Sequence, residues 1–125
     1  MLNALWVFLG SGLGGVLRCW SMAYTYQVCG KYFPFGTLVV NILGSFVMGL
    51  LACFIPLRFS ALETPLRALF LVGFLGGFTT FSAFSMDTLA LFDAGKYFLA
   101  IFYILMSVCS CLISVWLGTI AGKMI

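Results

Sequence analysis

Long apolar stretches alternate with short polar segments along the whole chain. Four apolar runs lie at approximately residues 4–29, 36–56, 66–91 and 97–121, and the three prolines fall at or beyond their ends. Each run reaches the ~20 residues that an α-helix needs to cross the hydrocarbon core of a bilayer. The pattern therefore predicts an all-α integral membrane protein, with a single four-helix transmembrane domain over residues 1–125.

The composition agrees with this pattern and excludes several classes of function. Of the 125 residues, 64% are hydrophobic and 7% are charged, against roughly 25% charged residues in soluble domains. The net charge of +3 is too small and too dispersed to favour a nucleic-acid partner. There is no histidine, and the five cysteines are scattered without metal-ligand spacing, so we expect buried apolar thiols. Because no Lys or Arg precedes Arg18, the first run is expected to be a retained helix rather than a cleaved signal peptide.

The positive charges are divided almost evenly between the two ends of the predicted bundle. If the N-terminus is cytoplasmic, Arg58, Arg67 and Lys123 lie on that side, and Lys31 and Lys96 lie on the other. The orientation of a membrane protein follows such Lys/Arg asymmetry. Three positive charges against two are too nearly equal to favour one orientation. We therefore predict that the chain inserts in both orientations and forms antiparallel homodimers in the lipid bilayer.

The fourth run carries a stripe of hydroxyl groups. Tyr103, Ser107, Ser110 and Ser114 follow at spacings of 4, 3 and 4, which holds them within a helical sector of roughly 60°. One interpretation is that they hydrogen-bond to neighbouring helices or to their own backbone carbonyls. The other is that they form one wall of a polar pathway, with Lys96 at its mouth.

The second run, "GTLVVNILGSF", places polar and small residues on one helix face. Thr37, Asn41, Gly44 and Met48 share this face at spacings of 4, 3 and 4. An Asn in mid-membrane is often an interhelical hydrogen-bonding residue and nothing more. Because its face carries the small residues, Asn41 could equally meet a solute at close range, and Thr37 would lie on the same side.

The first run, "GSGLGGVLRCW", contains glycines and one charge. Gly10, Gly12 and Gly15 satisfy G-x-G-x-x-G, but no strand precedes them, so the dinucleotide-binding interpretation fails. Gly10 and Gly14 instead predict a small-xxx-small surface for close helix packing. Arg18 is costly inside a membrane unless it is paired or hydrated. It either reaches the interface with its long side chain, or it faces a partner or a vestibule, where its charge would attract anions.

The third run contains "GFLGGFTTFSAFS", a segment rich in residues that weaken a helix. Gly76-Gly77 followed by Thr79-Thr80 predicts a break, which would free backbone carbonyls of the kind that bind monovalent cations. At 100° per residue, Phe78, Phe81 and Phe84 share one face with Ser85 and Thr88. The alternative is that the glycines permit close packing and the phenylalanines face lipid.

Taken together, these segments resemble one known family. "GSGLGGVLR", "GTLVVNILGSF" and "GFLGGFTTFSAFS", in this order in a chain of 125 residues, are similar to the Fluc family of fluoride channels, also called CrcB proteins. The resemblance implies a passive fluoride channel rather than an enzyme, located in the cytoplasmic membrane of a microbe and exporting fluoride that accumulates in the cell. It also implies an antiparallel homodimer with two pores.

The resemblance implies roles for single residues as well. Phe81 and Phe84 would turn their ring edges toward the ion, and Asn41 would line the pore. Gly76 and Thr79 would supply backbone carbonyls to a structural sodium ion at the dimer centre.

Arg18 matches an arginine near the pore entrance of the family. Tyr103 and Ser107 would begin a polar track. Cys111 occupies its next step, where a serine would be expected, so Ser110 or Ser114 would continue the track instead.

Two other classes of protein remain open at this stage. A small proton-coupled multidrug exporter of the four-helix type needs a carboxylate inside the membrane; Glu63 lies in a predicted loop, and Asp87 is the only candidate. A structural membrane subunit would transport nothing of its own.

Overall fold

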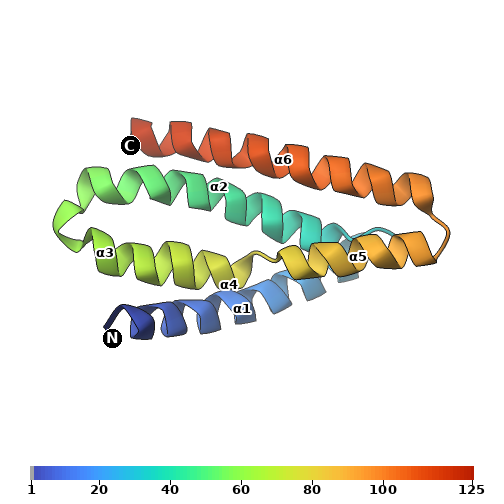
Figure 1. Cartoon of the computed structure of the whole chain (residues 1–125), viewed down its shortest axis with the longest axis horizontal. Coiled ribbons are helices and arrows are strands. Elements are labelled where there is room, and N and C mark those ends of the chain that lie inside the picture. The colour runs from blue at the N-terminus through green and yellow to red at the C-terminus, as the bar shows by residue number, and fades with distance from the viewer. Residues whose placement is uncertain (1) are drawn as a thin grey trace.

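The protein is a bundle of long helices that run back and forth along one axis. The computed structural model describes residues 2–125, and no strand occurs in this range. Figure 1 shows the chain reversing direction three times, with both termini at the same end of the bundle. The long helices are α1 (Leu2–Cys29), α2 (Phe35–Arg58), α5 (Phe81–Asp93) and α6 (Tyr97–Met124), and between α2 and α5 lie η1 (Ser60–Leu62), α3 (Glu63–Leu66), η2 (Arg67–Leu75) and α4 (Gly76–Phe78).

The predicted apolar runs agree with these helices to within a few residues. Helix α2 extends beyond the predicted end at Pro56 and stops at Arg58, because a proline in the last turn removes only one helical hydrogen bond. Three stretches, Phe35–Arg58, Ser60–Asp93 and Tyr97–Met124, are long and apolar enough to cross a membrane. An all-α membrane protein is therefore confirmed.

Glycines bring the helices into close contact. In α1, a Cβ at Gly10 or Gly14 would collide with the backbone carbonyls of Leu69 and Phe74 respectively, so the predicted small-xxx-small surface packs against the third membrane segment. Helices α2 and α6 approach in the same way, since Gly118 of α6 lies against the carbonyl of Phe46. Such contacts allow dispersion forces to act between backbones where lipid offers no hydrophobic driving force.

The third membrane segment is irregular on both sides of its break. Before the break, η2 is a π-helix of nine residues, which is unusual because π-helices mostly occur as single turns. At the break, Thr79 and Thr80 adopt extended backbone conformations, with ψ of 158° and 114°. The break was predicted from Gly76 to Thr80, but Gly76 and Gly77 remain helical in α4. Gly77 serves packing instead, since a Cβ there would approach the carbonyl oxygen of Ser11 to 2.5 Å.

Most of the outer surface is apolar. A small core joins Phe33, Leu38, Leu91, Ala100 and Tyr103, while large side chains such as Phe98, at 83% exposure, point outward. The expectation of buried thiols is wrong for this chain: all five cysteines are free, and Cys19, Cys29 and Cys109 are exposed. In a membrane protein an outward position is still an apolar one, because lipid replaces the protein core.

Candidate functional site

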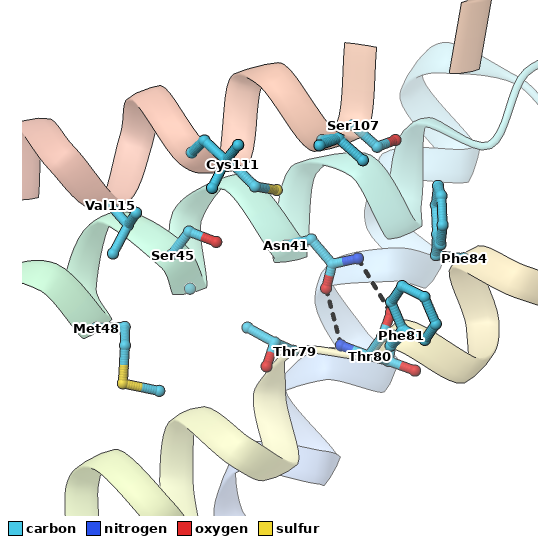
Figure 2. A pocket seen from close by; sticks show the side chains of 13 residues that line it. Asn41, Ser45, Met48, Thr79, Thr80, Phe81, Phe84, Ser107, Cys111 and Val115 are labelled. Atoms are coloured by element: carbon cyan, nitrogen blue, oxygen red, sulfur yellow. Dashed lines mark hydrogen bonds between the residues drawn. The ribbon is translucent and has the colours of Figure 1, made fainter. Parts of the chain in front are cut away.

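Asn41 of α2 holds the break in the third membrane segment. Its Nδ2 donates to the backbone carbonyl of Thr80 at 3.1 Å, and its Oδ1 accepts from the Thr80 amide at 2.8 Å (Figure 2). The side-chain amide of Asn41 thus pairs with both backbone polar groups of Thr80. Since unpaired backbone groups are costly inside a membrane, this double hydrogen bond explains why an Asn at mid-helix and an extended Thr occur together.

The break releases carbonyl oxygens of the turn that precedes it, those of Gly76 and Thr79 among them. In an uninterrupted helix the Thr80 amide would donate to the carbonyl of Gly76, and the Ala83 amide would donate to that of Thr79. Here Thr80 donates to Asn41, and Ala83 donates to the side-chain hydroxyl of Thr80 at 3.1 Å, which caps α5. Gly76 and Thr79 therefore lose their helical donors, and these are the residues whose carbonyls the family resemblance singled out.

Arg18 lies beside the break in the third membrane segment. Its Nη1 is 3.5 Å from the carbonyl oxygen of Thr79, and the residue is half-buried. The side chain crosses from α1 to the carbonyl end of α4, where the partial negative charge of the helix end favours a cation. The geometry explains how a charge is accommodated in this part of α1.

A cavity of about 360 Å³ opens beside the break, between α2, α5 and α6. Figure 2 shows Asn41 and Ser45 of α2, Ser107 and Cys111 of α6, and Phe81 and Phe84 of α5 around it. The lining is mostly apolar, with a few polar groups at fixed positions, as is typical of binding cavities. The cavity brings together Asn41, Phe81, Phe84 and Ser107 from the predicted pathway, and it also includes Thr79 from the predicted sodium site.

The two phenylalanines of α5 form an aromatic series with Tyr103. The ring centroids of Phe81 and Phe84 are 5.4 Å apart, and those of Phe84 and Tyr103 are 5.3 Å apart, with tilted planes in both pairs. Phe81 is 77% exposed in the single chain. Phe78 does not join them: it is buried in α4 and stacks on Phe74, because the extended residues of the break reset the helical phase.

Hydroxyl groups along α5 do not add to the cavity as the angular prediction suggested. Ser85 donates to the carbonyl of Phe81 at 3.0 Å, and Thr88 donates to that of Phe84 at 2.8 Å. Both hydroxyls are engaged by their own helix.

The predicted stripe of α6 divides into different roles. The Ser107 hydroxyl is buried without a hydrogen-bond partner in the described structure and belongs to a residue that lines the cavity. Ser110 donates to the carbonyl of Met106, its own helical neighbour, while Cys111 lines the cavity in its place. Ser114 donates to the carbonyl of Ile42 at 2.8 Å and joins two helices. Ser110 and Ser114 thus follow the hydrogen-bonding interpretation. Ser107 lies at the cavity, and Ser110 is not brought to it.

Asp87 joins Thr37 and Tyr103 in a cluster that sequence reasoning did not assemble. Oδ2 of Asp87 accepts a hydrogen bond from Thr37 at 2.5 Å and lies 3.4 Å from the Tyr103 hydroxyl. Thr37 and Tyr103 are completely buried, and Asp87 lines a second cavity of about 440 Å³. The sequence did carry one signal for this cluster, the carboxylate of Asp87 inside an apolar run, because such a group needs polar partners within the membrane.

These features define a small helical membrane protein with an interrupted helix beside a cavity of aromatic, amide and hydroxyl groups. Residues 5–119 match the family described as CrcB-like protein, Camphor Resistance (CrcB). The chain is 48% identical to the "Fluoride-specific ion channel FluC" of Coxiella burnetii (strain CbuK_Q154), over 98% of both chains. It is 45% identical to the protein of the same name from Magnetococcus marinus, over 96% of this chain and 97% of the relative. The chain belongs to the CrcB family.

Proposed function

We propose that the protein is a passive fluoride-selective channel that exports fluoride from the cytoplasm and so relieves its toxicity. The observation that carries this proposal is the Ser107 hydroxyl, which is buried without a partner and lines a cavity also lined by Asn41 and Phe81. The relatives named as fluoride-specific ion channels support it over almost the full length of the chain.

The donors of the cavity suit a small, strongly hydrated anion. An ion leaving water needs replacement donors, and a hydroxyl, an amide and the positive edges of aromatic rings can supply them. Conduction also requires that no single site bind too strongly. Neutral donors meet both requirements, and no charged residue among residues 3–125 lines the cavity that includes Ser107.

We propose the antiparallel dimer as the conducting unit, in the cytoplasmic membrane. Helix α1, with 28 residues, would cross together with the three apolar stretches. The exposed ring of Phe81 supports the dimer, because an aromatic surface beside a cavity fits a second copy that completes the pathway.

The carbonyls of Gly76 and Thr79 would hold a structural sodium ion between two copies. Oxygen ligands suit such a cation, and among the described residues no group of three or more Cys, Asp or Glu could bind a metal instead. The Arg18 guanidinium already lies at the Thr79 carbonyl, which indicates that this end of α4 attracts positive charge. Dimer stability in detergent should then rise with sodium and stay unchanged with an equal concentration of choline.

The exporter alternative is not favoured. Asp87 would have to exchange a proton for a cation, but its Oδ2 is held by Thr37 and lies beside Tyr103. The relatives described above are named as ion channels.

Purified protein in liposomes tests the proposal. Vesicles loaded with fluoride should discharge their gradient once a potassium ionophore balances the charge, and vesicles loaded with chloride should not. Discharge of neither anion would favour a structural subunit, and proton-driven cation uptake would favour the exporter.

A further inference from the structure

Two turns at one end of the bundle have the same tripeptide sequence. Gly30-Lys31-Tyr32 follows α1, and Gly95-Lys96-Tyr97 follows α5. Both glycines have positive φ, 77° and 73°, a conformation that side chains disfavour and that ends a helix. The Gly30 amide donates to the carbonyl of Tyr26, and the turn at Gly95 is closed by donation from Gly95 to Phe92 and from Lys96 to Leu91.

These two helix ends place their lysines around one cavity. Lys31 and Lys96 both line the cavity of about 440 Å³ that also includes Asp87. The Nζ of Lys96 lies 4.3 Å from the centre of the Tyr32 ring, so the second turn is fixed to the first by a cation–π contact. Within residues 3–125 the one ion pair joins Arg67 and Glu63, and both ammonium charges at this cavity are therefore uncompensated by a direct contact.

The cavity lies next to the proposed ion path. Asp87, which lines it, lies 3.4 Å from the Tyr103 hydroxyl, and the Tyr103 ring packs against Phe84, which lines the cavity at the break. Contacts of Tyr103 thus connect a residue of the two-lysine cavity with a residue of the cavity that includes Ser107.

We infer that Lys31 and Lys96 form an entrance that collects small anions, fluoride above all, for the path beyond Tyr103. The inference rests on the proposed channel function. The two ammonium groups act through water, by raising the local anion concentration. Among the residues that line this cavity, the two positive charges of Lys31 and Lys96 exceed the one negative charge of Asp87, and the Lys96 ammonium lies over the Tyr32 ring.

The dependence of flux on ionic strength tests this inference. Lys31→Gln and Lys96→Gln should each be made together with Lys123→Gln at the opposite end, so that the Lys/Arg balance that governs orientation is kept. In phosphatidylcholine vesicles at ~0.01 M salt, each double variant should conduct fluoride about twofold more slowly than both Lys123→Gln alone and the unaltered chain, which has the same difference in Lys/Arg between its two ends as the double variants. Adding an impermeant salt to ~1 M should abolish the difference, because screening then acts within about 3 Å. Lys96→Arg in the same background should retain the faster rate.

Each other outcome has a definite meaning. If Lys123→Gln conducts fluoride and the double variants match it at low salt, the entrance inference is wrong and the channel function stands. A deficit that persists at high salt would mean structural damage and would also overturn the inference. A deficit found only in vesicles of anionic lipid would indicate a lipid headgroup site instead. If the unaltered protein conducts no fluoride, the proposed function itself fails.

Discussion

At the scale of single residues, Asn41 combines structure and candidate chemistry. Its amide satisfies both backbone groups of Thr80, and the same residue lines the cavity at the break. Asn41 therefore couples the shape of the third membrane segment to the properties of the cavity. Sequence reasoning placed Asn41 on the correct helix face but could not find Thr80 as its partner, since 39 positions separate the two residues.

Replacing Asn41 by Leu should therefore remove conduction and destabilise the fold. Two backbone groups of Thr80 would lose their partner, which costs about 1–3 kcal/mol, and a bulky apolar group would enter the cavity. Denaturant titration in detergent and fluoride efflux from liposomes measure the two effects. Ser45→Ala, which alters the same cavity one turn along α2, should leave stability nearly unchanged; equal stability of both variants would contradict the role of Asn41.

The phenylalanines of α5 permit a sharper test of the ion path. Phe81→Ile and Phe84→Ile keep an apolar side chain but remove the ring quadrupole. A ring edge that contributes about 1–1.5 kcal/mol to ion passage would correspond to roughly a tenfold slower flux. Phe98→Ile, on the outer surface of α6, is the matched control and should conduct normally. Size-exclusion chromatography should show intact assembly in all three, and unchanged flux in both α5 variants would refute the ring-edge role.

At the scale of elements, the glycines of the chain are not equivalent. A Cβ at Gly77 would approach the carbonyl oxygen of Ser11 to 2.5 Å. A Cβ at Gly12, the next residue of α1, would meet no described atom within 4 Å. Gly77→Ala should therefore force α1 and α4 apart and cost about 1–3 kcal/mol. Gly12→Ala should be neutral or stabilising by up to about 1 kcal/mol. Denaturant titrations of the two variants measure this difference in stability. Equal stabilities would show that the fold does not need the close approach of α4 to α1.

The same scale shows how far the sequence pattern predicts the fold. Apolar run length located the helices, because crossing a bilayer imposes a length that the pattern records directly. The angular argument failed for Phe78, since 100° per residue assumes a regular α-helix and the chain passes here through η2 and an extended break. For the same reason the sequence predicted a break but not its limits. The Asp87 cluster depends on contacts between three helices, which no local pattern encodes.

At the scale of the whole molecule, charge decides how the chain lies in the membrane. Arg58 ends α2, Arg67 begins η2 and Lys123 lies in the last turn of α6, and these helix ends lie at the end of the bundle that carries both termini (Figure 1). Lys31 and Lys96 lie in the turns after α1 and α5, at the other end. Arg58 also donates to the carbonyl of Ile125, which fixes the C-terminus at its end. This arrangement keeps the three-against-two balance of the sequence, and an antiparallel pair requires both orientations to be populated.

Reporter fusions to the C-terminus test the balance. A phosphatase active only outside the cytoplasm and a fluorescent protein active only inside should both give signal from the unaltered chain, because the two ends carry nearly equal positive charge. Lys31→Gln combined with Lys96→Gln leaves three positive charges against none. The charged end should then remain cytoplasmic, so that fluorescence persists and phosphatase activity is lost. Since such a population cannot form antiparallel pairs, its fluoride flux should fall to background at any salt concentration. Signal from one reporter alone in the unaltered chain would exclude dual topology, and unchanged reporters in the double variant would mean that Lys/Arg number does not set orientation here.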